Sequence, residues 1–357
     1  MNARSLVIFS SLPEVGGHTT TTLKLCELLQ PMFGSVHVLV KDIPGHGFSP
    51  DAFDVLRRQG IHVVRCPGRD PVQWWKIVSE YRGADVFLAI GMRHLSPILS
   101  ALISARKSIY YHITHELTPA VIRQMKTYRL FFSQLAFISP ATAKLFPAHT
   151  PSAWALQPTE LPIQPGAEPR RPGRPRVGFL GRLNEAKGLA VLMDLVGRST
   201  IPCELHVAGS GPMEDIVLER QRRNPETFFF HGSFSAAGRA EFLRQFFSEI
   251  DFLCVPSMDD REGMPNVILE ALQFGVPVLA TCTGGMRSFA MPALGPASPD
   301  VVQIVEPTNF PAAFRSLLST PPPTESVRER CRAYFEKFFS DSVLAVDWGK
   351  ILGSHPR

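Results

Sequence analysis

The strongest constraint on the fold is a local pattern that occurs twice, once near the start of each half of the chain. In the first copy, LVIFSSL is followed by PEVGGHTTTT and by LKLCELL; in the second, VGFLGRL is followed by NEAKG and by LAVLMDLV. Each copy is typical of a strand, a glycine-containing loop and a helix. Further apolar runs alternate with helical stretches, and near-continuous apolar strands indicate parallel sheets covered on both faces. The pattern therefore predicts an α/β fold with two doubly wound sheets.

The length and a proline-rich stretch predict where the domains divide. A chain of 357 residues exceeds what one hydrophobic core usually organises. Residues 147–175 are rich in proline, a composition that favours an extended linker. We therefore predict Rossmann-like domains at residues 1–165 and 166–335, with their parallel sheets facing a central cleft. Residues 336–357 are predicted to form a C-terminal helix that crosses back to the N-terminal domain.

Composition and charge narrow the classes of partner. Hydrophobic residues make up 45% of the chain and charged residues 19%, which is typical of a folded globular protein. Residues 1–165 hold 16 Lys and Arg against 10 Asp and Glu, whereas the remainder holds 21 against 22. This basic excess suits an anionic acceptor or peripheral contact with the inner face of the cell membrane, and equally a solvated surface. Because no dense run of Lys and Arg is present, no nucleic-acid partner is expected.

The cysteines and the N-terminal run bear on the location of the protein. The six cysteines are scattered singly, without zinc-binding spacing, so we expect reduced thiols. The first apolar run is too short for a signal peptide, and no stretch approaches about 18 apolar residues. A cytoplasmic location is therefore expected, with the peripheral membrane contact as an open alternative.

The segment from Ser257 to Thr281 carries the most chemical information. A loop containing Glu262 ends where the helical stretch NVILEALQFG begins, and the start of a helix offers backbone N–H groups that can hold a diphosphate. Glu270 is the fifth residue of that stretch and so lies in the second turn of the helix. Two carboxylates so placed can grip a sugar and a ribose at different ends of one ligand. Taken alone, they equally fit a capping Glu and a solvent-facing helical Glu.

The stretch EGMPNVILEALQFGVPVLAT resembles the signature of retaining GT-B glycosyltransferases of family 4, in which two Glu residues flank seven others. GRLNEAKG, VAGSGP, HGSFS, FISPATAKLF and YFEKFFS resemble the family in the same order. The resemblance implies the GT-B fold, with an acceptor-binding domain at 1–165 and a nucleotide-sugar-binding domain at 166–335. It also implies donor binding by part of the signature, namely Gly263, Met264, Pro265, Asn266, Val267 and Glu270, with Glu262 holding the sugar.

GRLNEAKG places two cations, Arg182 and Lys187, between a strand and the next helix. The planar guanidinium of an Arg and the flexible ammonium of a Lys can together bind a diphosphate. They can also stabilise the negative charge that builds up on a departing nucleoside diphosphate. Two solvated surface cations are the alternative. We predict that both residues take part in catalysis.

Several smaller loops are predicted to contact the donor because of the family resemblance. In the second domain, these are Gly181, Gly209 in VAGSGP, and His231 and Gly232 in HGSFS, whose backbone is expected to meet the base. In the first domain, Gly16 and Gly17 are expected to form the glycine loop that faces the donor phosphate. Without the family resemblance, a tight turn with no ligand would explain these two glycines equally well.

YYHITHELTP places His112 and His115 at the end of a strand, where open α/β sheets bind ligands. By resemblance to the family's His, which precedes an acidic residue, His115 is predicted to lie near the transferred sugar. His112 is the second choice, and a structural role remains open for each.

The predicted reaction moves a sugar, with retention of configuration, from a nucleoside diphosphate sugar to a hydroxyl of a glycan, lipid or small molecule. The acidic run from Asp259 to Glu262 can suggest a divalent metal; we predict no metal and no further cofactor, because cations and helix termini already face the leaving group and the family needs none. The alternatives are an epimerase or phosphorylase of the same fold, and an inactive nucleotide-sugar-binding subunit. A nicotinamide dehydrogenase is disfavoured because the first strand lacks a full GxGxxG.

Overall fold

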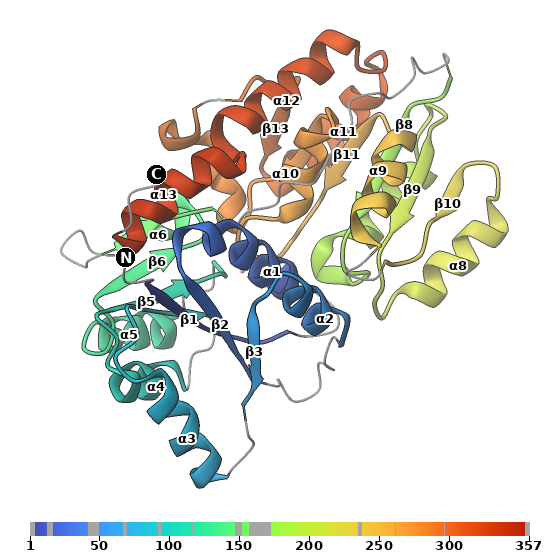
Figure 1. Cartoon of the computed structure of the whole chain (residues 1–357). Helices are drawn as coiled ribbons and strands as arrows, with labels where there is room; N and C mark the ends of the chain where they lie inside the picture. Colours follow the sequence, from blue (N-terminus) through green and yellow to red (C-terminus); the bar gives the residue numbers. More distant parts are fainter. Residues whose placement is uncertain are drawn as a thin grey trace. The chain divides into compact units, whose positions relative to one another are not determined.

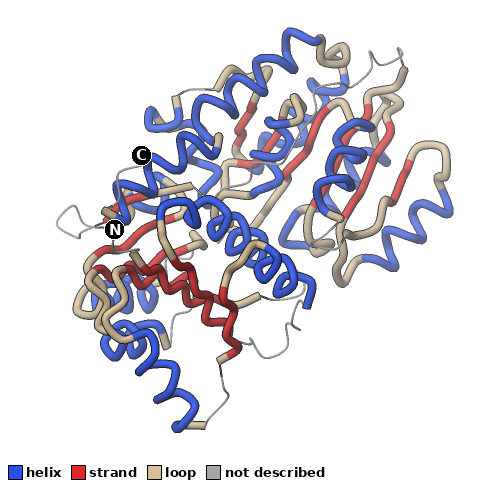
Figure 2. Tube along the Cα trace, viewed as in Figure 1, coloured by secondary structure: helices blue, strands red, loops and turns tan. Residues whose placement is uncertain are grey.

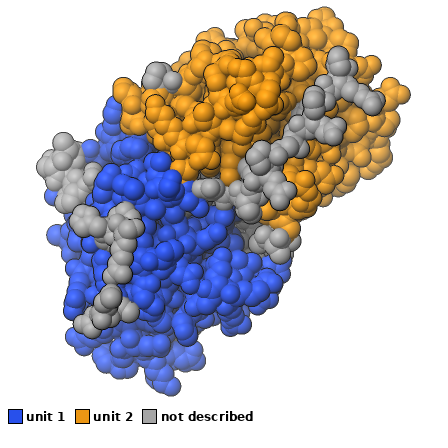
Figure 3. Space-filling view, turned by 45° about the horizontal axis from the view of Figure 1, so that its top comes forward, with its two compact units in different colours: residues 1–159, 341–357 blue, residues 160–340 orange. Residues whose placement is uncertain are grey.

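The chain divides into two compact units, unit 1 with residues 1–159 and 341–357 and unit 2 with residues 160–340 (Figure 3). The computed structural model describes residues 4–12, 17–41, 50–66, 70–91, 95–115, 118–146, 152–156, 173–234, 238–260, 262–295 and 297–353. The predicted boundary between residues 165 and 166 lies outside these ranges.

Unit 1 is built on a seven-stranded parallel sheet in the order β3-β2-β1-β4-β5-β6-β7 (Figure 1). The strands are β1 (Ser5–Ser10), β2 (Ser35–Val40), β3 (His62–Arg65), β4 (Val86–Ile90), β5 (Lys107–His112), β6 (Gln134–Phe137) and β7 (Ser152–Trp154). The helices are α1 (Gly17–Leu29), α2 (Pro50–Arg58), α3 (Pro71–Tyr81), α4 (Ser96–Ile103), α5 (Pro119–Tyr128), α6 (Pro140–Ala143) and α13 (Asp341–Leu352).

Unit 2 contains a six-stranded parallel sheet in the order β10-β9-β8-β11-β12-β13. Its strands are β8 (Arg176–Leu180), β9 (Glu204–Ala208), β10 (Phe228–Phe230), β11 (Phe252–Val255), β12 (Val278–Thr281) and β13 (Val302–Val305). Its helices are α7 (Leu189–Gly197), α8 (Glu214–Arg223), α9 (Arg239–Glu249), α10 (Asn266–Gln273), α11 (Phe310–Leu318) and α12 (Glu325–Phe339).

The central strands of each sheet are buried on both faces, as their composition predicts, and helices flank the sheets in the tube view (Figure 2). In β1, Val7 and Phe9 pack into one core with residues of α3, α4 and α5. Leu6 and Ile8, which point the other way, are equally buried. The prediction of two Rossmann-like domains with parallel sheets is therefore confirmed.

The strand order places a topological switch point in each sheet. The order reverses at β1 and β4 in unit 1, and at β8 and β11 in unit 2. Ligands of open α/β sheets bind outside the carboxyl ends of the strands at such a point, because the following loops diverge there. The predicted site residues follow β1, β5, β8, β9, β10 and β11.

The proline-rich stretch is not wholly a linker. Within it, Ser152–Trp154 form β7, which pairs with β6 in parallel at the edge of the first sheet. An edge strand needs hydrogen bonds on one side only, so flanking prolines are compatible with it. The proline-rich composition of this stretch therefore gave no indication of the short strand within it.

The last described helix, α13, packs within unit 1. Trp348 on α13 is fully buried, and its Nε1 donates a hydrogen bond to the carbonyl oxygen of Leu156 at 3.2 Å. Its ring meets that of Tyr111 edge to face at 4.9 Å between centroids. Between the end of α12 at Phe339 and the start of α13 at Asp341, the backbone of Ser340 is extended. The range 336–357 thus contains the end of one helix and all of the next.

An ion-pair network ties the amino end of the second sheet to α12. The carboxylate of Asp251, which is 1% exposed, accepts hydrogen bonds from the backbone N of Arg176 at 3.0 Å and from its Nε at 3.3 Å. Arg328 of α12 lies 3.8 Å from the same carboxylate. Because β8 begins at Arg176 and β11 begins directly after Asp251, the network joins the starts of the two central strands to α12.

No described helix has the length and apolar character needed to cross a bilayer. Peripheral contact through the basic N-terminal half stays a prediction.

Candidate functional site

In unit 2, the loop after β8 is shaped by a cap and by a glycine. Asn184 Oδ1 accepts a hydrogen bond from the backbone N of Lys187 at 3.0 Å, which caps the short 3₁₀ turn Glu185–Lys187. Gly188 follows with φ 74°, and a Cβ there would lie 1.9 Å from the carbonyl oxygen of Pro256. Only glycine both adopts this positive φ readily and has no Cβ to collide with that oxygen. Lys187 is therefore held beside the end of β11.

Lys187 Nζ forms an ion pair with Glu262 Oε2, although the residues are 75 positions apart in the sequence. The loop of Glu262 is itself anchored, because its carbonyl oxygen accepts a hydrogen bond from the backbone N of Gly285 at 2.8 Å. A Cβ on Gly284 would lie 2.2 Å from the same oxygen. Both side chains remain partly exposed, at 32% for Lys187 and 14% for Glu262, so a ligand can reach them.

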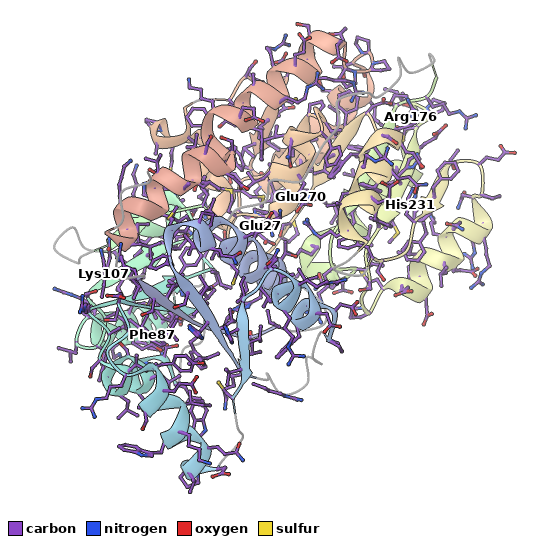
Figure 4. All side chains as sticks on the ribbon, in the orientation of Figure 1. Glu27, Phe87, Lys107, Arg176, His231 and Glu270 are labelled. Carbon is purple, nitrogen blue, oxygen red and sulfur yellow. The ribbon has the colours of Figure 1, made fainter. Side chains whose placement is uncertain are left out.

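Glu270 lies on α10 and is almost fully buried, with 3% of its side chain exposed (Figure 4). Its Oε1 accepts a hydrogen bond from Arg239 Nη2, and Arg239 also lies over the ring of Phe234, 5.8 Å from the centroid. A buried carboxylate needs such a partner. Sequence reasoning missed Arg239, because a cation in the first turn of a helix has no special spacing and opposes the helix dipole.

The start of α10 lies directly after the Glu262 loop. Pro265 is its N-cap and, within the described chain, no side chain caps the helix there. Gly263, Met264 and Pro265 are buried, whereas Asn266 and Val267 are half-buried in the first turn. The predicted signature residues are thus brought together around one helix end.

Three glycine-containing loops adjoin at the carboxyl ends of β8, β9 and β10. Gly209 has φ 130°, and a Cβ there would lie 1.9 Å from the carbonyl oxygen of Gly181. The backbone N of Gly209 donates to the carbonyl oxygen of Gly232 at 2.7 Å. Arg182 is exposed beside Gly181. His231 precedes Gly232, and its side chain stacks on His206 of β9, with 5.3 Å between the ring centroids.

In unit 1, both candidate histidines are buried at the end of β5. His115 Nδ1 lies 2.9 Å from Thr142 Oγ1, which in turn lies 2.9 Å from Ser139 Oγ, the N-cap of α6. His112 Nε2 lies 3.3 Å from Thr114 Oγ1. Gly16 lies outside the described residues, and Gly17 is the first residue of α1. The donor and catalytic roles of these residues stay predictions.

A third histidine, His18, lies at the switch point of the first sheet and was not singled out from the sequence. Its Nδ1 is 3.0 Å from the carbonyl oxygen of Ser11, at the end of β1. A Cβ on Gly91, which follows β4, would lie 2.9 Å from its Nε2. Burial lowers the pKa of His18, and a backbone hydrogen bond at Ser11 partly opposes this. In the sequence, His18 is marked only by its place directly after two glycines. Its position between the ends of β1 and β4 depends on the pairing of these two strands.

Two histidines of unit 1 predict that stability depends on pH. Burial is the main cause that lowers the pKa of both His18 and His37 below the ordinary value of 6.5. In the unfolded chain they take up protons near that value, whereas in the folded chain they resist protonation. The free energy of unfolding should therefore be fully maintained above about pH 6.5 and fall as the pH drops below it.

Urea denaturation across this pH window, with each midpoint converted to a free energy, measures the effect. A stability that stays constant or rises between about pH 6.5 and pH 5 would contradict it.

Comparison with known proteins adds a family and a fold. Residues 174–318 match the family model described as glycosyl transferases group 1. The matched range contains Lys187, Arg239, Glu262 and Glu270. No curated protein matches the sequence.

Solved structures resemble the chain over almost its whole length. HepE of Anabaena, in complex with UDP and glucose, is 15% identical with a TM-score of 0.74, and the match covers 98% of this chain and 99% of that one. A glycosyltransferase from Rickettsia africae is 12% identical with a TM-score of 0.74, covering 99% and 98%. The catalytic domain of starch synthase IV from Arabidopsis thaliana, bound to ADP and acarbose, is 11% identical with a TM-score of 0.69, covering 99% of each chain. At these identities the likeness is one of fold.

Proposed function

We propose that this chain, whose residues 174–318 match the family model described as glycosyl transferases group 1, moves a sugar from a nucleoside diphosphate sugar to a hydroxyl group. The acceptor is a glycan, a lipid or a small molecule, and the anomeric configuration is retained, as in family 4. The observation that carries the proposal is the Lys187–Glu262 pair, a cation and a carboxylate held at the carboxyl ends of β8 and β11.

Lys187 and Arg182 bind the diphosphate in this proposal. Negative charge grows on the diphosphate as the bond to the sugar breaks, and fixed cations stabilise that charge more in the transition state than in the ground state. The first turn of α10, whose N-cap offers no side-chain acceptor, supports the same charge with its N–H groups. Glu262 exchanges part of its contact with Lys187 for hydroxyl groups of the sugar.

Glu270 binds the ribose. Its Oε1 accepts from Arg239, and a carboxylate has two oxygens, so Oε2 can accept from a ribose hydroxyl. Arg239 orients the buried carboxylate through its hydrogen bond to Oε1. The glycine loops at Gly181, Gly209 and Gly232 allow the backbone to approach the nucleoside closely.

Unit 1 supplies the acceptor side. His115, held by Thr142, lies at the end of β5, and His18 lies at the switch point between β1 and β4. The acceptor hydroxyl attacks the anomeric carbon while the bond to the diphosphate breaks, and the departing phosphate takes the acceptor proton. No metal enters this scheme, because the site already contains cations and a helix terminus.

Nucleoside diphosphates test the proposal without knowledge of the acceptor. HepE was solved with UDP and starch synthase IV with ADP, so UDP, ADP and GDP are compared with the matching monophosphates by thermal melting. One diphosphate should stabilise the protein, by about 2.7 kcal/mol at a hundredfold excess over its Kd, and its monophosphate should do so much less. If no diphosphate raises the melting temperature, the proposed site is wrong.

Product analysis with the matching nucleotide sugar then separates transfer from the alternatives. Transfer predicts that nucleoside diphosphate is released together with a new glycoside, and that the glycoside keeps the anomeric configuration of the donor. An altered nucleotide sugar, or a sugar phosphate, would instead indicate an epimerase or a phosphorylase.

A further inference from the structure

Three side chains of types that can bind a metal converge at the edge of the second sheet, next to the Gly232 loop that is proposed to approach the nucleoside. His206 lies on β9, His231 (labelled in Figure 4) follows β10, and Glu249 is the last residue of α9. Within the described ranges, these residues form a group whose ligand atoms all lie within 4.8 Å of one another. Because they come from three different elements, the fold and not the local sequence brings them together.

The distances within this cluster suit a common ion. His206 Nδ1 lies 3.1 Å from His231 Nε2, and Glu249 Oε2 lies 3.7 Å from the first nitrogen and 3.8 Å from the second. Ligand atoms about 2.0–2.1 Å from a tetrahedral zinc ion are separated by roughly 3.3 Å. The carboxylate oxygen is almost equidistant from both nitrogens and too far from either for a hydrogen bond. That position is typical of a third ligand around a shared cation.

A fourth residue, Glu204, supports the same assignment. Its Oε2 lies 3.6 Å from Nε2 of His206, on the side of the ring opposite to the nitrogen that faces the cluster. Metal-bound histidines usually direct their second nitrogen to a carboxylate, which fixes the ring orientation. Two imidazoles and one carboxylate favour Zn²⁺ or a related first-row ion over Mg²⁺ or Ca²⁺.

We propose that His206, His231 and Glu249 form a binding site for a divalent transition-metal ion, with Zn²⁺ as the expected occupant. The side chain of Glu249 is 38% exposed, so the ion has a path from solvent and a fourth position for water. The ion joins β10, the edge strand of the sheet, to β9 and to the end of α9. Its role is to stabilise unit 2, and the proposal does not depend on the proposed sugar transfer.

The test uses the full-length chain without an affinity tag, freed of metal by a chelator. Equilibrium dialysis should show one Zn²⁺ or Co²⁺ ion per chain, and the Co²⁺ form should have the visible absorption of a four-coordinate site. Zn²⁺ at a hundredfold excess over its Kd should raise the melting temperature by about 5–10 °C, whereas Mg²⁺ should not. Absence of a stoichiometric ion would overturn the proposal.

Matched variants locate the site. Glu249→Gln and His231→Asn should each weaken Zn²⁺ binding at least about tenfold and abolish the Co²⁺ spectrum. Glu241→Gln, on the same helix and in a surface pair with Arg244, should bind Zn²⁺ like the parent chain. Affinities are measured well below the melting temperature of each metal-free variant, so a change in stability cannot mimic lost binding. Unchanged affinity in both cluster variants would also overturn the proposal.

Discussion

Replacing Lys187 by alanine is expected to lower turnover about a hundredfold. The change removes the cation proposed to stabilise the leaving diphosphate, and it leaves the carboxylate of Glu262 without its ion-pair partner. Because the stabilised charge develops mainly in the transition state, kcat should fall far more than the affinity for the donor. Initial rates of nucleoside diphosphate release, measured with a nucleotide sugar that contains the diphosphate identified by thermal melting, give both quantities.

A double-mutant cycle sharpens this test. Glu262→Gln alone should also reduce turnover at least tenfold, and the Lys187→Ala/Glu262→Gln double variant should lose little more than the worse single variant, because the two side chains act as one unit. Arg244→Ala is the control, since it removes a cation from an exposed surface pair of the same unit. Turnover of Lys187→Ala within threefold of the control, on the order of 0.6 kcal/mol, would exclude the assigned role.

The largest expected effect on stability comes from Asp251→Ala. This substitution removes the buried carboxylate that pairs with Arg176 and faces Arg328, and so leaves two partly buried cations without their anion. Breaking a buried pair from one side typically costs about 3–5 kcal/mol. Urea denaturation followed by circular dichroism should show that loss in the transition of unit 2.

Asp194→Ala is the matched control for this variant. Asp194 pairs with Arg198 four residues later on the surface of unit 2, and both side chains are well exposed. Such pairs contribute about 0.3–0.5 kcal/mol. If Asp251→Ala costs no more than Asp194→Ala, the network does not hold the central strands in the way proposed.

Much of the fold could be predicted because apolar strands buried on both faces leave a clear pattern. LVIFSSL and VGFLGRL became β1 and β8, the central strands of the two sheets. The edge strands were harder to find. β7 has three residues inside a proline-rich stretch, and β13 is only half-buried, so neither shows a long apolar run.

Candidate site residues could be named one by one from the sequence, but their pairings could not. Lys187 and Glu262 were both singled out, yet their ion pair depends on β8 and β11 being neighbours, which follows from the strand order. Arg239, the partner of Glu270, has no distinctive spacing in the sequence, and His206 is brought to His231 only by the pairing of β9 with β10. Local sequence patterns indicate which residues lie in the loops that follow the strands, whereas the order of the strands determines which of these loops are neighbours.

Because α13 belongs to unit 1, a ribosome makes the last helix of that unit only after all of unit 2 has been synthesised. Until then, the ring of Tyr111 lacks Trp348, and the carbonyl oxygen of Leu156 lacks its indole donor. Unit 2 can therefore fold before unit 1 is complete. Until α13 has been synthesised, the surface of unit 1 around Tyr111 stays exposed and can be bound by chaperones.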